Sequence, residues 1–377
     1  MHFYIHIPFC RQKCPYCKFA LTPIFDDLKK KRYLEYLKKE IREYFSKLET
    51  SDPGKLPENN KERLVPRSQW QKQRTIYFWW GTPSILSHDE VRDILECFPF
   101  YREKCVEISF ESNPEDLTRK YVSGLFELGI TRLSVGVQSL NDETLKSIHR
   151  SDRKSIFQAL SAIREAFTDF LGISVNVDFI LGLPYVKPWE TLENIEEIHA
   201  TFPFISHTST YILEDEKYPK DWKENSLTET EIQKEFLNIL GYFEWKNWNH
   251  YELSNFSHPG YECKHNQSYW DHSPYRWFWL SASSYEGWKR WNNTPSFSGY
   301  FAGKIGDEET LTDEQIEIEK MMFWLRTDGY DIQKWGINRE KLNQFIEERL
   351  ITQTDKKIRL TKTWIFLIDH IMSGLLL

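Results

Sequence analysis

The sequence predicts an α/β protein built on a parallel sheet, and two observations support this prediction. Short runs rich in β-branched and aromatic residues alternate with longer amphipathic stretches through the first two thirds of the chain. A strand followed by a helix, repeated six times, is typical of a parallel sheet with helical crossovers, either doubly wound or an incomplete barrel. Because active sites in such folds lie at the carboxyl ends of the strands, the residues just past each strand are the candidates for function.

Six strands and seven helices make up this alternating part. The predicted strands are His2–Ile7, Thr75–Phe78, Val106–Phe110, Arg132–Val137, Ser174–Ile180 and His207–Tyr211. The predicted helices are 27–47, 88–97, 116–128, 141–149, 154–168, 189–199 and 228–243.

Two regions fall outside the alternation. The polar segment 48–73 has no clear period, and we expect a long surface loop there. After about residue 270 the pattern changes to a charged helix near 312–326, a helix near 338–350, a basic hairpin-like stretch (ITQTDKKIRL) and a last helix. This order predicts a small, mostly helical C-terminal domain that resembles a winged helix.

The composition excludes several classes of protein. Of the 377 residues, 40% are hydrophobic and 28% charged, which rules out bulk disorder. A net charge of −7 argues against nucleic acid as the main partner, because phosphate neutralisation needs a basic surface. No apolar run approaches the roughly 18 to 20 residues of a membrane span, and the N-terminal residues lack the features of a signal peptide. We therefore expect no integral membrane segment and a cytoplasmic location.

Three of the six cysteines lie close together, directly after the first predicted strand. Cys10, Cys14 and Cys17 have the spacing C-x3-C-x2-C. Soft thiolates on one short loop can surround an iron–sulfur cubane, and three of them leave one iron free for an exchangeable ligand. The alternatives are a zinc site that lacks its fourth ligand, or three incidental thiols, but zinc ligands usually come as paired C-x2-C elements.

This motif, with Tyr16 before its last cysteine, resembles the radical S-adenosylmethionine (SAM) superfamily. Five further segments match, in order, its oxygen-independent coproporphyrinogen oxidase branch: GTPS at 81–84, FESNPEDLT at 110–118, SVGVQSLNDETLKSIHR at 134–150, VDFILGLP at 177–184 and HYELSNF at 250–256. The resemblance implies an incomplete (β/α)6 barrel over residues 1–270, then a linker and a C-terminal domain over 271–377. It also implies that Cys10, Cys14 and Cys17 hold a [4Fe–4S] cluster whose open iron binds SAM.

Two groups within this branch differ beside the cluster. The coproporphyrinogen dehydrogenases resemble C-x3-C-x2-C-x-C, whereas this chain has Phe19 two residues past Cys17. The heme chaperones have phenylalanine there and carry an H-N-x-x-Y-W motif implicated in heme binding. This chain matches that motif with His265, Asn266, Tyr269 and Trp270. Imidazole is a reasonable axial ligand for heme iron, and aromatic side chains can pack on the porphyrin face. The alternative is that His265 is a hydrogen-bonded loop residue, which is the more common case for an isolated histidine.

The resemblance therefore favours a heme chaperone that binds a [4Fe–4S] cluster, SAM and heme and passes heme to an acceptor protein, without coproporphyrinogen oxidase turnover. An electron donor for the cluster is implied as a second partner. The first alternative is an oxygen-independent coproporphyrinogen III oxidase, which would decarboxylate two propionates by radical abstraction. The second is a non-catalytic paralogue that keeps the fold without SAM cleavage.

The same resemblance assigns residues to the SAM site. Glycines with close backbone approach are expected after the second strand, where this chain has Trp80 and Gly81 before Thr82. Polar residues at or after later strands complete the prediction: Glu111 with Asn113, Gln138, Arg150 for the SAM carboxylate, and Asp178, together with Tyr4 on the first strand. For Glu111, Arg150 and Asp178 the alternative is structural ion pairing.

Tryptophans stand at positions where this family has glycines. The chain has 15 tryptophans and only 16 glycines, and eight of the tryptophans fall on expected glycines: Trp79, Trp80, Trp248, Trp277, Trp279, Trp288, Trp324 and Trp364. Trp270 and Trp291 match tryptophans of the family. Our hypothesis is that the source organism reads UGA as glycine, which would give 24 glycines and 7 tryptophans. The alternative is a degenerate relative with a blocked SAM pocket.

Overall fold

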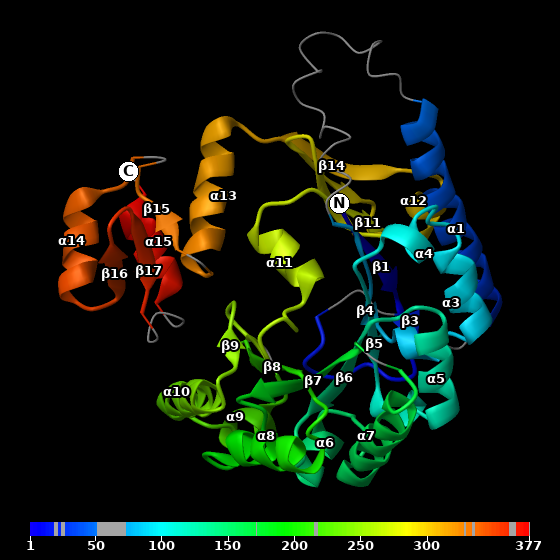
Figure 1. Cartoon of the computed structure of the whole chain (residues 1–377), viewed down its shortest axis with the longest axis horizontal. Coiled ribbons are helices and arrows are strands. Elements are labelled where there is room, and N and C mark those ends of the chain that lie inside the picture. Colours follow the sequence, from blue (N-terminus) through cyan, green and yellow to red (C-terminus); the bar gives the residue numbers. More distant parts are fainter. Residues whose placement is uncertain are drawn as a thin grey trace.

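A curved, mainly parallel sheet with helices on its outer side dominates the computed structural model, and a smaller C-terminal unit lies to one side (Figure 1). The structure describes residues 1–18, 22–23, 27–50, 73–170, 172–214, 218–327, 329–333, 336–361 and 367–376. Most of the predicted surface loop 48–73 lies outside the described residues, and its first three residues belong to the long helix α1 (Asp27–Thr50).

The six predicted strands are present and lie parallel to one another in chain order. They are β1 (His2–Ile7), β4 (Thr75–Gly81), β5 (Glu107–Ser112), β6 (Arg132–Gln138), β7 (Ser174–Leu181) and β8 (His207–Ile212). Within the described residues, β1 and β8 do not pair with each other, because β1 continues to β11 (Tyr275–Phe278) and β8 to the antiparallel β10 (Asn255–Ser257). The predicted fold class, an incomplete α/β barrel, is thereby confirmed.

Each of these strands has one apolar and one largely polar face. The outward residues, such as Phe3, Ile5 and Ile7 of β1, join the main hydrophobic core beneath the helices. Alternate residues point into the barrel lumen, and these are mostly polar: His2, Tyr4, His6, Thr75, Tyr77, Glu107, Ser109, Glu111, Arg132, Ser134, Asn176, Asp178, His207 and Ser209. Hydrogen bonds cross the lumen from strand to strand, for example from Arg132 Nη1 to the Tyr77 hydroxyl at 3.2 Å. The barrel therefore has a polar interior enclosed by an apolar shell.

The helical layer forms because amphipathic segments return the chain between parallel strands. In α7 (Arg153–Phe167), Ile156, Ala159, Leu160 and Ile163 are buried at helical spacing, and the Asp152 side chain caps the first turn. The other helices of this layer are α1, α3 (His88–Leu95), α4 (Tyr101–Lys104), α5 (Arg119–Glu127), α6 (Asp142–Ser147), α8 (Glu190–Thr201), α9 (Lys220–Glu224) and α10 (Glu229–Trp245), with short 3-10 turns η3 (Pro83–Ile85) and η4 (Pro114–Asp116). All seven predicted helices are present.

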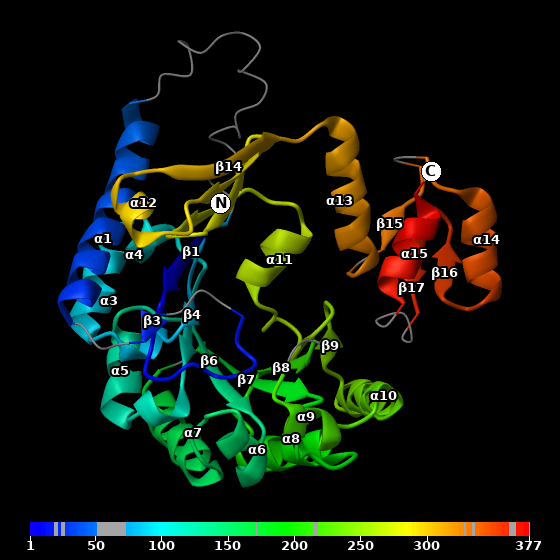
Figure 2. The same cartoon turned by 180° about the vertical axis from the view of Figure 1, so that it is seen from behind.

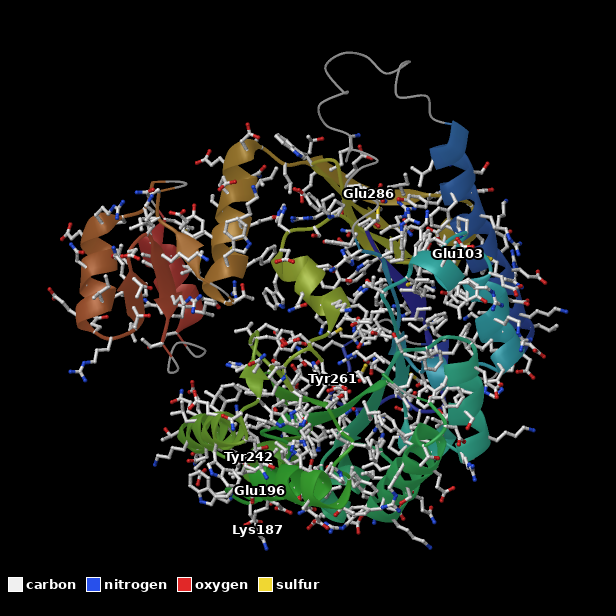
Figure 3. The ribbon with its side chains drawn as sticks, in the orientation of Figure 1. Glu103, Lys187, Glu196, Tyr242, Tyr261 and Glu286 are labelled. Carbon is white, nitrogen blue, oxygen red and sulfur yellow. The ribbon has the colours of Figure 1, made fainter. Side chains whose placement is uncertain are left out.

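Neighbouring helices of this layer also contact each other at the outer edge of the molecule. Glu196 of α8 and Tyr242 of α10 lie near each other there, and the Glu196 charge adds to burial in raising the pKa of Tyr242 to about 12 (Figure 3).

The sheet continues beyond residue 270, where the sequence analysis placed the end of the barrel domain. Strand β11 pairs in parallel with β1, and β12 (Ser283–Glu286), β13 (Lys289–Asn293) and β14 (Ile305–Thr310) extend the same sheet in antiparallel fashion. A short helix, α12 (Phe297–Phe301), lies between β13 and β14. Antiparallel neighbours need no helical crossover, which is why the strand–helix alternation stops although the sheet does not.

The C-terminal unit has its own hydrophobic core. It consists of α13 (Asp313–Leu325), α14 (Arg339–Glu347), α15 (Ile368–Leu375) and a three-stranded sheet of β15 (Tyr330–Asp331), β17 (Lys357–Leu360) and β16 (Ile351–Thr354). The basic stretch 351–360 forms the β16–β17 hairpin, as expected from the sequence. In both views α13 lies between the barrel and the rest of this unit (Figures 1 and 2).

Candidate cofactor site

The three clustered cysteines lie on the loop that follows β1, at the carboxyl end of the barrel. Cys10 ends the short strand β2 (Phe9–Cys10), which pairs with β3 (Thr22–Pro23), and is buried, whereas Cys14 and Cys17 are half-buried. The Cys17 amide donates to the Cys14 carbonyl at 3.0 Å, which closes a tight turn between them. Burial raises the pKa of the Cys10 thiol to about 11; the hydrogen bond from Thr82 opposes this shift, and the nearby thiols of Cys17 and Cys14 add to it.

This donor set fits an iron–sulfur cubane. All three thiols are free of disulfides and lie on one loop within electrostatic reach of each other. In the part of the chain that the structure describes, no group of three His, Cys, Asp or Glu side chains is placed to hold a single metal ion. Thiolates that each bind a different iron of a cubane do not converge on one point, so the arrangement is compatible with a cluster.

A chain of hydrogen bonds connects the cysteine loop to the ends of three strands. The Thr82 hydroxyl donates to Cys10 Sγ at 3.1 Å, and Asn113 Nδ2 donates to Thr82 Oγ1 at 3.3 Å. Arg150 Nη1 donates to Asn113 Oδ1 at 2.7 Å and Nη2 to the Gly136 carbonyl at 2.6 Å. Four of the residues singled out from the sequence (Cys10, Thr82, Asn113 and Arg150) are therefore in one network, as expected if strand ends form the site.

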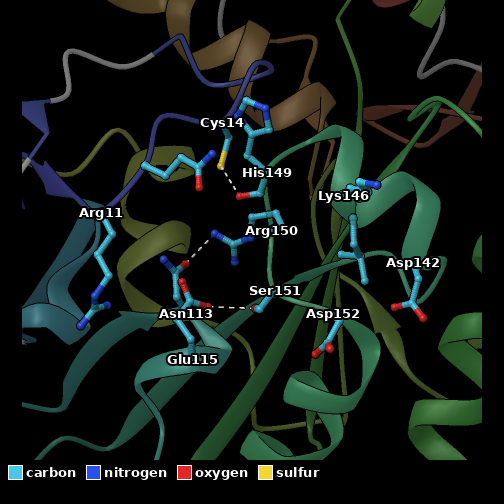
Figure 4. Close-up of a pocket in the computed structure, with 12 residues that line it drawn as sticks. Arg11, Cys14, Asn113, Glu115, Asp142, Lys146, His149, Arg150, Ser151 and Asp152 are labelled. Atoms are coloured by element: carbon cyan, nitrogen blue, oxygen red, sulfur yellow. Dashed lines mark hydrogen bonds between the residues drawn. The ribbon is translucent and has the colours of Figure 1, made fainter.

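A pocket of about 680 Å³ opens beside this network (Figure 4). Its walls include Cys14, Asn113 and Arg150 from the predicted set. The other lining residues have no role predicted from the sequence, although most of them lie within the segments that match the family. They are Arg11, Gln12, Glu115, Asp142, Leu145, Lys146, His149, Ser151 and Asp152. The signal that could have found them is their position directly after β5 and around α6, between strand ends already identified.

Position 81 requires a glycine, because the backbone there lies against the end of the first strand. The φ of Gly81 is +65°, and a Cβ at this position would lie 1.8 Å from the Ile7 carbonyl oxygen and 3.1 Å from the Phe9 amide nitrogen. No side chain fits between these backbones. The close approach therefore positions Thr82 beside Cys10.

Two predicted carboxylates lie together in the lumen. The Tyr77 hydroxyl donates to Glu111, while Asp178 accepts from Ser134 Oγ at 2.9 Å and from Asn176 Nδ2 at 2.8 Å. Burial, and then the charge of Asp178, raise the pKa of Glu111 to about 8. Burial also raises the pKa of Asp178. At neutral pH Glu111 is therefore largely protonated and can donate a hydrogen bond as well as accept one.

The raised pKa of Glu111 has a measurable consequence for stability. Its folded-state pKa lies above the ordinary 4.5, so the folded chain binds more protons than the unfolded chain between these values, and the free energy of unfolding falls as pH rises from about 5 to 8. One such proton contributes up to about 1.4 kcal/mol per pH unit. Urea unfolding at several pH values is expected to show a shallower fall for Glu111→Gln than for the original chain. The exposed Glu127→Gln is the control, and equal slopes for all three proteins would contradict the assignment.

Gln138 and Tyr4 occupy the two remaining predicted positions. Gln138 ends β6 with φ +68°, where the register with β7 shifts, and its buried Oε1 has no hydrogen-bond partner among the described residues. Such an unpaired acceptor suits a donor group of a bound ligand. Tyr4 is fully buried, and its hydroxyl donates to the Trp79 carbonyl at 3.2 Å. The tyrosine ring thus packs under the adjacent tryptophans instead of facing the pocket.

Four of the tryptophans at expected glycine positions, Trp79, Trp80, Trp277 and Trp279, lie around the carboxyl ends of β1, β4 and β11. The Tyr4 and Trp277 rings are 4.3 Å apart between centroids, His6 stacks on Trp279 at 3.8 Å, and Trp79 and Trp80 are 5.7 Å apart. Trp79, Trp80 and Trp277 are half-buried, whereas Trp279 is buried in the main hydrophobic core, where it also contacts Tyr33 of α1 and Phe297 of α12.

The backbone at several of these tryptophans has a conformation that favours glycine. Trp80, Trp279 and Trp288 have φ of +55°, +143° and +72°. Trp364 lies outside the described residues. Trp189, which the sequence analysis did not include, also has a positive φ of +74° at the start of α8. These backbones agree with the recoding hypothesis at three of its positions.

The HNQSYW motif forms the short helix α11 (Lys264–Trp270), which covers the amino ends of β1, β4 and β5. His265 is fully buried: Nδ1 is 2.6 Å from Thr75 Oγ1 and Nε2 is 2.8 Å from the Tyr269 hydroxyl. The Glu107 carboxylate accepts from the amides of Lys264 and His265 at 2.8 and 3.1 Å. Both ring nitrogens of His265 are thus occupied, so heme coordination needs one of these hydrogen bonds to break.

The other two motif residues are also partly enclosed. Trp270 packs edge-on against Phe323 of α13, with ring centroids 5.8 Å apart. The buried Oδ1 of Asn266 has no hydrogen-bond partner within the described ranges. Because α11 covers the amino ends of the strands and the cysteine loop follows the carboxyl end of β1, the motif lies at the opposite end of the barrel from the cysteine loop. The structure does not bring the two predicted sites together.

No helix in the described part of the chain is long and apolar enough to cross a membrane.

In sequence, the chain is 25% identical to the heme chaperone HemW of Lactococcus lactis, over 99% of this chain and 97% of that protein. It is 30% identical to HemW of Synechocystis, over 79% and 69%, and 27% identical to HemW of Bacillus subtilis, over 95% and 94%.

The fold matches a solved structure closely. Coproporphyrinogen III oxidase (HemN) from Escherichia coli superimposes with a TM-score of 0.75 over 99% of this chain and 89% of that chain, at 18% identity, which shows a shared fold. The sequence profile of the Radical SAM superfamily matches residues 4–198, just over half of the chain. Together with the 30% identity to the Synechocystis protein, this match shows that the chain belongs to the radical SAM superfamily and, within it, to the HemW family.

Proposed function

We propose that this chain is a heme chaperone that binds a [4Fe–4S] cluster, SAM and heme and transfers heme to an acceptor protein. The observation that carries the proposal is the joining of a three-cysteine loop to three strand ends through Thr82, Asn113 and Arg150, in a chain whose relatives are named heme chaperones. An electron donor for the cluster is the second partner that this function needs. We expect the protein to act in the cytoplasm.

Each residue of the site has a physical role in this proposal. Cys10, Cys14 and Cys17 hold the cluster, which supplies the electron for SAM chemistry when it is bound. Arg150, already oriented by Asn113 and Gly136, offers a guanidinium to the SAM carboxylate.

The other SAM contacts come from the strand ends. The Gly81 backbone and the Thr82 hydroxyl face the methionine part of SAM, with position 80 beside them. Gln138 Oε1 accepts a donor group of the ligand, and the carboxyls of Glu111 and Asp178, with Tyr4 beside them, lie on the lumen side.

Oxygen-independent coproporphyrinogen III oxidase activity is the second candidate, and the polar lumen favours it. Arg132, His207 and Glu111 are inward-facing groups that could receive a polar substrate above the barrel floor. Against it stands Phe19, where the dehydrogenases have a further cysteine. Anaerobic protein that retains heme and does not turn over coproporphyrinogen supports the chaperone. Turnover of coproporphyrinogen would support the oxidase instead.

The heme site is tested by removing the imidazole of His265. His265→Ala is expected to weaken heme binding at least tenfold, measured from the Soret band, while cluster assembly remains, because α11 is remote from the cysteine loop. Thr75→Val is the matched control, since it removes the hydrogen bond to Nδ1 but keeps the imidazole. If both variants weaken heme binding equally, or neither does, His265 supports the fold and the iron ligand lies elsewhere.

A further inference from the structure

A second pocket lies between the barrel and the C-terminal unit, away from the cofactor site. Its volume is about 180 Å³. The barrel contributes part of α10, His250 of β9 (Asn249–His250) and Glu252, and the C-terminal unit contributes the end of α13 and β17. The argument rests on Phe236, Leu240, His250, Glu252, Arg326 and Arg359, and the exposed carboxylate of Glu244 also lines the pocket.

The guanidinium of Arg326 is a largely buried positive charge, and the carboxylate nearest to it, that of Asp369, is distant and exposed. The Arg326 side chain is only 12% exposed; Nη1 donates to the Met322 carbonyl at 2.9 Å, and Nη2 is 4.0 Å from an oxygen of Asp369, which is itself 97% exposed. Burial lowers the pKa of this guanidinium, and the Asp369 charge opposes the shift. A desolvated guanidinium gains most from a carboxylate that can bind in bidentate fashion. Arg359 adds a second guanidinium on the exposed side of the pocket.

The barrel side adds an unsatisfied polar group. Glu252 is 4% exposed, and in the part of the chain that the structure describes its Oε1 has no hydrogen-bond partner. Burial raises its pKa to about 7, so near neutral pH a large fraction is protonated and can donate to an oxygen. His250 Nε2 lies 3.2 Å from the Leu253 carbonyl, so Nε2 carries the proton of the neutral ring. Phe236 and Leu240 form an apolar wall between these groups.

We propose that this pocket binds a carboxylate arm of an organic ligand, specifically a propionate of the tetrapyrrole. The inference rests on the proposed heme function. The pocket is smaller than the roughly 300 Å³ at which sites for whole organic ligands begin, so it holds a side chain of the ligand and not the macrocycle. The guanidiniums of Arg326 and Arg359 face the carboxylate, and the apolar wall contacts the methylenes of the arm. The C-terminal unit thereby takes part in heme recognition.

The test compares heme with heme dimethyl ester, in which both propionates are blocked, by Soret titration of the full chain. The original protein is expected to bind heme at least tenfold more tightly than the diester. Arg326→Gln is expected to weaken heme binding about tenfold and leave diester binding unchanged, so that the preference disappears. Arg339→Gln, an exposed arginine of α14 that does not line the pocket, is the control and is expected to behave like the original protein.

The possible outcomes separate this inference from the proposed function. Equal affinity for heme and its diester in the original protein, or an unchanged preference in Arg326→Gln, would overturn the propionate site while heme binding stands. Binding of neither compound would overturn the proposed function and this inference with it. Arg359→Gln, a change at an exposed position, serves if Arg326→Gln does not fold, and it is expected to reduce the preference in the same direction.

Discussion

Cys14→Ala is expected to abolish the brown iron–sulfur chromophore of anaerobically reconstituted protein. Each of the three thiols is needed to hold a different iron, so the loss of one removes one of the three protein ligands of the cluster. Cys14 is half-buried and lines the main pocket, where its thiol is 4.0 Å from the His149 carbonyl. Alanine there removes the ligand without disturbing the core. Iron and sulfide content per chain, together with the visible absorbance, measure the effect.

Cys105→Ser is the matched control for this experiment. The Cys105 thiol lies 3.4 Å from the Arg74 carbonyl and 3.3 Å from the Glu107 carbonyl, far along the chain from the cysteine loop, and a serine hydroxyl can donate to the same oxygens. This variant is expected to keep a full cluster, as are changes at Cys97 and Cys263. A full iron complement in Cys14→Ala would refute the ligand assignment.

The proposed SAM binding requires glycine at positions 79, 80, 277 and 279. The chain with tryptophan at these positions is expected to have no measurable SAM affinity, and the four-glycine chain is expected to bind SAM. The four indoles lie around the carboxyl ends of β1, β4 and β11, and an aromatic side chain covers about 150–250 Å² when it is buried. Trp80 precedes Gly81, where the backbone approaches Ile7 closely, and its ring packs edge-on against His6, with ring centroids 5.8 Å apart. The left-handed backbone at Trp80 adds strain of about 1–2 kcal/mol that glycine relieves. Isothermal titration with SAM and the soluble yield of both proteins check this result.

Trp291→Gly is the control for the tryptophan series, because this tryptophan matches the family and the Arg276 guanidinium lies 5.0 Å from its ring centre. It is expected to lower stability and to leave SAM binding absent. Equal solubility and equal SAM affinity of the original and the four-glycine chains would mean that the tryptophans are native and the protein is a divergent relative. The codons give an independent check, since TGG at 79, 80, 277 and 279 would exclude recoding.

Much of the fold follows from the sequence because each parallel strand is a short buried run between amphipathic helices. The strand order also predicts that Thr82, Asn113 and Arg150 lie near one another, since the carboxyl ends of parallel strands meet at one edge. The extension of the sheet past residue 270 could not be predicted, because β12, β13 and β14 are antiparallel and leave no strand–helix signal. The sequence pattern around His149 and Lys146 predicts only a helix, so their place at the pocket could not be predicted either.

The surroundings of His265 show a different limit of sequence reasoning. Its motif is short and local, but one ring nitrogen bonds Thr75, 190 residues away, and that contact exists only once β4 and α11 are packed together. No pattern around position 265 signals that the imidazole is enclosed. A motif therefore predicted which residues act together, while the fold determined what they touch.

The helix-facing and lumen-facing residues of the barrel strands are constrained in different ways, and this explains how far the sequences of such proteins can diverge. The helix-facing residues need only to be apolar and of suitable volume, and cores tolerate many such exchanges. The lumen-facing residues carry the polar chemistry and contribute little to that core. Ligand preference can thus change at alternate positions while the architecture persists, so a fold shared with HemN at a TM-score of 0.75 coexists with only 18% identity.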